Sequence, residues 1–148
     1  MIKLPECFYN DIVEYGKNGV PEEICGLIGG VVSDGDKEIK EIYFLENTDH
    51  SNEHFSMNPV DQFAAVRDMR GKGLSPLGNF HSHPESPSRP SEEDKRLAYD
   101  KDASYMILSL MNIDKPVLKS FHIEDGTVTE EEIIIEEDNE KSQGIFTK

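Results

Sequence analysis

The chain has 148 residues and a formal net charge of −15 at pH 7, and 36% of its residues are hydrophobic. This length and composition are typical of one folded domain that buries a core without disulfide bonds, which argues against global disorder. Binding to nucleic acid or to an anionic membrane surface requires basic patches, so a chain this acidic is a poor candidate for either.

Cysteine content and hydropathy indicate the compartment. Cys7 and Cys25 are the only cysteines, and there is no CxxC motif. The N-terminus lacks an apolar core of signal-peptide length, and no apolar run approaches the ~18–20 residues of a membrane-spanning helix. We therefore expect a cytoplasmic protein with reduced thiols.

The first half of the chain mixes helical and strand patterns. Apolar side chains recur at a helical period near the N-terminus and again after Asn58-Pro59, a pair typical of an N-cap and first helical residue. Between them, two apolar runs flank the hairpin signal Ser33-Asp34-Gly35-Asp36, and Gly29-Gly30 in the first run suggests a bulge. The expected elements are a helix over 4–17, strands over 21–32 and 37–45, and a helix over 59–70.

The second half predicts a strand over 74–83, followed by a stiff, irregular connection with three prolines over 84–90. The remaining expected elements are a helix over 91–99 and strands over 103–111, 116–124 and 127–135. We expect a mixed α/β layered domain over 1–135, with about six strands and three helices, and an acidic, flexible tail over 136–148.

The residues with the clearest chemistry are His81-Ser82-His83-Pro84 and the later Asp94. Side chains alternate along a strand, so both imidazoles point to one side and can reach one cation. Two neutral nitrogens and one carboxylate oxygen suit Zn²⁺ and leave its fourth position for water, as a hydrolytic site requires. Either half of this pattern also has an ordinary interpretation: HxH pairs occur by chance, and Ser91 followed by acids is a typical helix start.

A general base is also needed, and Glu22-Glu23 stand where the apolar strand begins. A carboxylate at the mouth of such a strand would be partly desolvated, which raises its proton affinity. Two acids there are otherwise an ordinary polar strand entrance. His50 and His54 are interpreted as loop histidines, His122 as a structural residue, and Cys25 as a small buried side chain.

Taken together, the stretch around Glu23, the histidine pair and the stretch from Ser91 to Asp94 resemble the JAMM (MPN+) metalloproteases, over about residues 1 to 135. The looser signals Asn47, Phe55, Met57 and Asn58-Pro59 agree with the family's intervening segment. The motif residues are Pro21, Glu23, Cys25, Gly26 and Leu27; His81, His83 and Pro84; and Arg89, Pro90, Ser91 and Asp94.

The resemblance implies a curved, mostly antiparallel β-sheet flanked by helices, a layered fold like that of cytidine deaminases. It implies one zinc per chain, bound by His81, His83 and Asp94. Glu23 would be the general base, with Glu22 a bystander, and the Ser91 hydroxyl would hydrogen-bond the oxyanion or the metal-bound water.

The resemblance also suggests a substrate. Similar eukaryotic domains cut isopeptide bonds after the Gly-Gly tail of ubiquitin, and small stand-alone prokaryotic relatives act on ubiquitin-like sulfur carriers. We therefore expect hydrolysis of a peptide or isopeptide bond after a Gly-Gly tail, with the polar segment 47–57 binding the tail by strand addition.

Other classes remain open from the sequence. One is a non-catalytic MPN-like interaction module with a surviving metal site. A relative of the RadC proteins is disfavoured by Glu85-Ser86-Pro87 after the histidines and by the acidity of the chain. An amidohydrolase would need a barrel larger than this chain, and a metallo-β-lactamase would need further Asp and His residues just after the pair.

Overall fold

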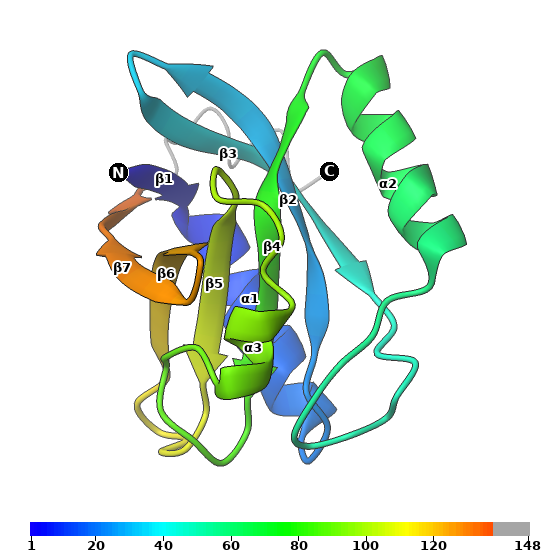
Figure 1. Cartoon of the computed structure of the whole chain (residues 1–148), viewed down its shortest axis with the longest axis vertical. Helices are drawn as coiled ribbons and strands as arrows, with labels where there is room; N and C mark the ends of the chain where they lie inside the picture. Colours follow the sequence, from blue (N-terminus) through cyan, green and yellow to red (C-terminus); the bar gives the residue numbers. More distant parts are fainter. Residues whose placement is uncertain (138–148) are drawn as a thin grey trace.

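The computed structural model describes residues 1–137, so the acidic tail predicted over 136–148 lies almost wholly outside the described residues. Within 1–137 the chain forms three helices and eight strands (Figure 1). The helices are α1 (Glu6–Gly19), α2 (Pro59–Gly71) and α3 (Glu92–Arg96). The strands are β1 (Ile2–Pro5), β2 (Cys25–Ser33), β3 (Asp36–Leu45), β4 (Ser75–His83), β5 (Ser104–Ser109), β6 (Val117–Glu124), β7 (Thr127–Glu131) and β8 (Ile133–Glu136).

All eight strands belong to one sheet, in the order β7-β6-β5-β4-β2-β3-β1-β8. β7 and β8 stand at opposite ends of this order although Glu132 alone separates them in the chain, so the sheet curves until it nearly closes. β4 pairs with β5, and β1 with β3 and β8, in parallel, while the other pairs are antiparallel. The predicted fold class, a mixed α/β domain with a curved, mostly antiparallel sheet, is confirmed.

Local turn and cap chemistry explains the elements that were predicted well. Ser33 and Asp36 pair across a two-residue turn in which Asp34 and Gly35 both have positive φ, the geometry of a tight hairpin. The Asn58 side chain accepts a hydrogen bond from the Val60 N–H at 2.8 Å, as an N-cap does. The pairings of β2 shift register around Gly29, where a bulge was expected.

The predicted number of strands, about six, is lower than the observed eight for two reasons. The predicted first helix began too early, because Ile2 and Leu4 are fully buried and alternate with half-buried neighbours in β1, a strand period. The predicted strand over 127–135 divides at Glu132 into β7 and β8, which pair with different partners. α3 is also shorter than predicted and ends at Arg96.

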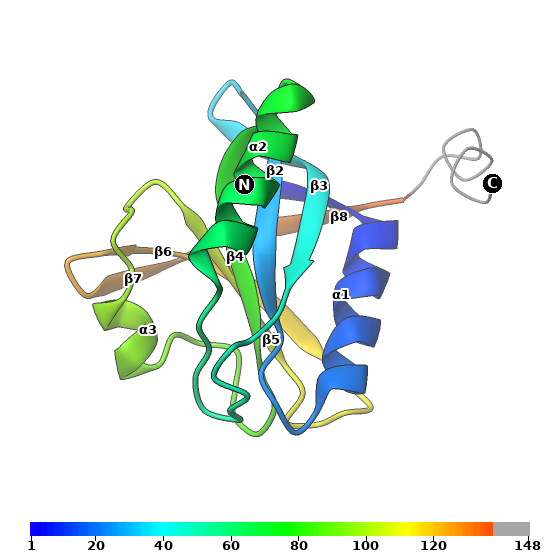
Figure 2. The same ribbon diagram turned by 90° about the vertical axis from the view of Figure 1, so that its right-hand side faces the viewer.

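Two apolar clusters lie on opposite faces of the sheet. Met106 and Leu108 of β5 join the main core with Ile12 of α1, whereas Ile107 between them packs with Phe121 in a second cluster. Figure 2 shows α1 and α3 on opposite sides of the strands, which matches this alternation. The face of β5 that carries Ile107 is therefore the face that α3 covers, because Ala98 just beyond α3 packs there.

α2 departs from the expected one-sided apolar pattern. Its buried residues are Ala65 and Met69, while Val60 is 73% exposed and Phe63 is 62% exposed. The C-terminal half of α2 contacts the sheet through Met69, whose side chain lies against Gly29. No helix within residues 1–137 is long and apolar enough to cross a membrane.

A pair of glycine substitutions tests how closely β4 packs against β5. Gly78 of β4 has a φ of +153°, and a Cβ there would collide with the backbone of Ser104 in β5. We expect Gly78→Ala to lower the free energy of unfolding by about 2 kcal/mol or more. Gly71→Ala, in open space at the end of α2, should instead raise it by about 0.5–1 kcal/mol. Urea unfolding measures both, and a Gly78→Ala protein as stable as the wild type would contradict the close approach of β4 and β5.

Candidate metal centre

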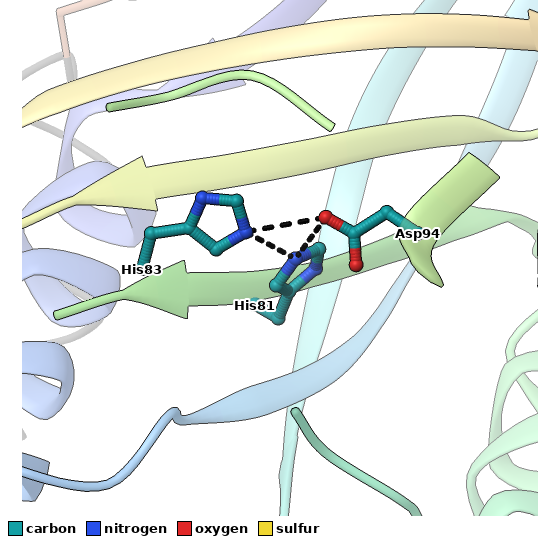
Figure 3. A group of neighbouring side chains, drawn as sticks. All are labelled: His81, His83 and Asp94. Atoms are coloured by element: carbon teal, nitrogen blue, oxygen red, sulfur yellow. Dashed lines mark hydrogen bonds and ion pairs between the residues drawn. The ribbon is translucent and has the colours of Figure 1, made fainter. Parts of the chain in front are cut away.

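The three predicted ligands converge on the face of the sheet that α3 covers (Figure 3). His81 pairs with Ile107 in the parallel register of β4 and β5, so both side chains point towards α3. His83 follows on the same face, and both imidazoles are buried, at 3% and 5% exposed. Asp94 comes from the first turn of α3 and reaches back to both rings.

The donor atoms form a nearly equilateral triangle. The Nε2 atoms of His81 and His83 are 3.2 Å apart, and Oδ2 of Asp94 is 3.3 Å from the first and 3.2 Å from the second. Two ligands bound to zinc at 2.0–2.1 Å with a tetrahedral angle stand about 3.3–3.4 Å from each other. These residues therefore fit a zinc ion with three protein ligands. Among residues 1–137 they form the one group of His, Cys, Asp and Glu with suitable spacing.

The start of α3 holds the carboxylate in place. The Ser91 backbone N–H donates to Oδ2 of Asp94 at 2.9 Å, and the Asp94 N–H donates to the Ser91 hydroxyl at 3.0 Å. Ser91 is thus the N-cap that the sequence suggested. Burial alone would raise the pKa of Asp94, but the hydrogen bonds with His81, His83 and the Ser91 backbone hold it well below its ordinary value. Asp94 is therefore ionised, as a metal ligand must be.

The second ring nitrogen of His83 is also fixed. Its Nδ1 lies 2.9 Å from the Pro87 carbonyl oxygen, so the Nδ1–H donates there and Nε2 is left with its lone pair towards the triangle. The loop that supplies Pro87 is tied to β5, since Ser88 donates to the Ile107 carbonyl and the Ser109 hydroxyl donates to the Ser86 carbonyl, both at 2.6 Å.

Glu23 lies just before β2 and is only 4% exposed. Its backbone N–H donates to the Ser51 carbonyl at 2.8 Å, and its carbonyl accepts from the Asn47 amide at 3.0 Å. Burial raises the pKa of its carboxyl group to about 8, with His83 lowering it and Asp94 raising it. These charges place Glu23 within electrostatic range of the triangle, and a divalent cation there would lower its pKa.

Ser82, between the two histidines, is a positioning residue that the sequence reasoning missed. Its hydroxyl accepts from the Ile24 N–H at 2.8 Å, and its own N–H donates to the Ile24 carbonyl at 3.0 Å. Ser82 is fully buried, and Ile24 directly follows Glu23. The strand that carries the histidines is thereby bonded to the residue beside the buried glutamate. Strand alternation predicts that Ser82 faces away from the histidines, but it does not predict its partner.

The segment 47–57 closes one side of the group. The ring of Phe55 stacks on the imidazole of His81, with centroids 4.6 Å apart and planes at 28°. His50 and His54 of this segment are exposed and contact Glu22 and Asp49, so they stand apart from the triangle, as expected for loop histidines.

Residues 5–124 match the model of the prokaryotic homologues of the JAB domain. The chain belongs to this family. It is 28% identical over 128 residues to the CysO-cysteine peptidase of Mycobacterium tuberculosis, covering 86% of each protein. It is also 29% identical over 72 residues to a desampylase of Pyrococcus furiosus, covering 49% of each. The family resemblance noted from the motifs is confirmed.

Two solved structures of similar proteins have this fold. A protein from Desulfitobacterium hafniense has 48% sequence identity and a TM-score of 0.87, over 95% of this chain and 97% of its own. A JAB1/MPN domain protein from Archaeoglobus fulgidus, at 22% identity, has a TM-score of 0.58 over 91% of this chain and 97% of its own. The second likeness concerns the JAB/MPN fold alone.

The buried carboxyl of Glu23 predicts a pH-dependent stability of the metal-free protein. Its folded pKa is raised from 4.5 to about 8, so between these values the folded state binds more protons than the unfolded state, and stability falls as pH rises. Glu23→Gln should therefore stabilise the metal-free protein at pH 8 by an amount on the order of 2–4 kcal/mol, with the gain vanishing towards pH 4.5. Thermal unfolding with a chelator present measures this, and Glu14→Gln on the exposed side of α1 is the control. A gain that grew as pH fell would contradict it.

The Ser82 contact predicts a local effect. Ser82→Ala leaves the buried Ile24 N–H without its acceptor, which should cost about 1–3 kcal/mol of stability. Ser120→Ala is a matched control, because Ser120 is also fully buried but bonds Glu131 instead. Native-state hydrogen exchange should show faster exchange of the Ile24 amide in Ser82→Ala than in Ser120→Ala at equal global stability. Equal protection of Ile24 in both variants would argue against the contact.

Proposed function

We propose that this JAB-family protein is a zinc metallopeptidase that cleaves a peptide or isopeptide bond after the Gly-Gly tail of a ubiquitin-like or sulfur-carrier protein. One observation carries the proposal. Donor atoms of His81, His83 and Asp94 lie 3.2–3.3 Å from one another, in a buried setting within electrostatic range of the buried carboxyl of Glu23. A purely structural zinc site would be closed by a fourth protein ligand, and no fourth residue completes this group within the part of the chain that the structure describes.

His81, His83 and Asp94 would hold the zinc. When bound, zinc would supply Lewis acidity that activates a water molecule and polarises the scissile carbonyl group. The three residues would hold the ion on the face of the sheet that α3 covers, with the Phe55 ring stacked on His81 beside them.

Glu23 would act as the general base. It takes a proton from the attacking water and delivers it to the amine nitrogen as the carbon–nitrogen bond breaks. Burial raises its pKa to about 8, and a bound divalent cation would lower it again, towards a value at which the carboxylate can accept a proton and then release it. Glu22 is 45% exposed and contacts His50, which supports its place as a bystander.

Ser91 would stabilise the oxyanion. Its hydroxyl accepts a hydrogen bond from the Asp94 N–H, so the hydroxyl proton is still available to donate. A donor fixed at a helix cap beside the ligand Asp94 is well placed to stabilise the charge that develops on the substrate oxygen.

The substrate class rests on the relatives and on segment 47–57. Relatives named as a CysO-cysteine peptidase and a desampylase support a hydrolase of this family that processes ubiquitin-like or sulfur-carrier proteins. Because Phe55 stacks on His81, a tail bound along segment 47–57 would end at the ligand triangle. Two glycines at the end of the tail would pass beside this ring most easily, since they carry no side chain. We assign this activity to a single domain over 1–135, in the cytoplasm.

Metal content and activity test the proposal together. We expect about one zinc per chain by elemental analysis, lost in His83→Ala and retained in Glu23→Gln. With a Gly-Gly carrier that bears a C-terminal extension, Glu23→Gln should reduce kcat by about 10²–10⁴-fold, because the general base is removed.

Glu22→Gln is the matched control and should retain nearly wild-type kcat. A wild-type protein that stays metal-free when zinc is offered would overturn the zinc assignment. Full zinc occupancy without turnover of any Gly-Gly-tailed carrier would instead indicate a non-catalytic interaction module.

A further inference from the structure

Two buried polar atoms lack a hydrogen-bond partner, and both belong to β4. They are Oδ1 of Asn79 and Nδ1 of His81, the two such side-chain atoms among residues 1–137. Leaving a buried donor or acceptor unpaired costs about 1–3 kcal/mol, so each such atom needs an explanation. The occurrence of both at positions two residues apart suggests a common cause.

The two side chains lie on the same face of β4. Asn79 pairs with Tyr105 and His81 with Ile107, and Tyr105 and Ile107 belong to the apolar cluster on the α3 side. Residues two apart on a strand are separated by about 6.6 Å along its axis, so their side chains are neighbours. In Figure 3 the ring nitrogen of His81 without a dashed contact lies on the side of the ring away from His83.

The two atoms are chemically complementary. The Nε2 atom of His81 is part of the ligand triangle, so the tautomer that can bind a metal carries its proton on Nδ1 and makes this atom a donor. Oδ1 of Asn79 is an acceptor. A single water molecule bridges a donor and an acceptor about 5–5.5 Å apart, a span that suits side chains at this spacing.

We propose that Asn79 is the positioning residue for His81, accepting the His81 Nδ1–H hydrogen bond through one buried water molecule. This inference rests on the proposed zinc site. Asn79 would then do for His81 what the Pro87 carbonyl does for His83: select the tautomer and hold the ring angle. Each histidine would then be oriented through its Nδ1 atom, His83 by the backbone carbonyl of Pro87 and His81 by the side chain of Asn79.

A ligand in the neighbouring cavity is the competing explanation for the unpaired oxygen. Asn79 also lines a cavity of about 710 Å³ together with Leu97 and Tyr99. However, His81 does not line this cavity, so a ligand bound there would leave Nδ1 of His81 without a partner. A water molecule between the two side chains would account for both unpaired atoms at once.

The inference predicts a loss of metal affinity rather than a general loss of stability. Asn79→Leu keeps a similar volume and removes the acceptor, so the His81 ring loses its orienting bond. We expect the zinc affinity of the Asn79→Leu protein, measured by chelator competition, to be about 10–100-fold lower than that of the wild type. Asn79→Asp keeps an oxygen at the same position and should bind zinc at least as tightly as the wild type.

Nitrogen NMR of the zinc-loaded wild-type protein provides a second readout that needs no variant. The His81 ring should be protonated at Nδ1, and this proton should exchange slowly with solvent because it is hydrogen-bonded in the interior. In Asn79→Leu the same signal should move and exchange faster, while the His83 Nδ1–H signal is retained as an internal control.

Three results would overturn the inference. They are wild-type zinc affinity in Asn79→Leu, an unchanged His81 Nδ1–H signal in that variant, and a zinc-loaded crystal structure in which Nδ1 bonds another group. Each leaves the zinc site itself intact. Failure of the wild-type protein to bind zinc would instead refute the proposed function, so the two failures are distinguishable.

Discussion

The double pairing of β4 is the constraint on which the site depends. β4 is bonded to β2 on one side and to β5 on the other, so its backbone cannot twist or slip without breaking two ladders. Strand alternation then sends His81 and His83 to one face and Ser82 to the other. One short strand thus aims both histidines at Asp94 and bonds the residue that follows Glu23. The ligand pair and the buried carboxylate share a single rigid support.

The hydrogen bonds that cap α3 also orient Asp94, the proposed third ligand. An Asp three residues after a Ser N-cap is an ordinary way to begin a helix, and Asp94 makes both bonds of that motif with Ser91. The Oδ2 atom that accepts from the cap is also the atom that faces the histidines. The carboxylate is therefore oriented before any cation arrives, which lowers the cost of ordering it on binding. The interpretation of these residues as a helix start is confirmed, and it is compatible with the proposed role of Asp94 as a ligand.

The sequence predicted what local rules control. The histidine pair, Asp94, the hairpin at Asp34-Gly35 and the cap at Asn58 depend on period, turn chemistry or motif spacing, which the residues carry themselves. The bond of Ser82 to Ile24 and the Phe55 stack join residues from separate elements, so no local pattern contains them. β1 was missed for the same reason, because its four residues form a strand only by pairing with β3 and β8.

The near-closure of the sheet has a consequence for how the chain can fold during synthesis. β1 begins at the second residue, yet one of its two partners is β8, which ends at Glu136. The segment from β1 through β8 must therefore leave the ribosome before these two strands can pair. Contacts between distant parts of a sequence also slow folding, since loop closure must precede the gain from pairing. The nascent protein therefore holds Ile2 and Leu4, two residues that are fully buried in the folded state, without their final neighbours until β8 has been synthesised.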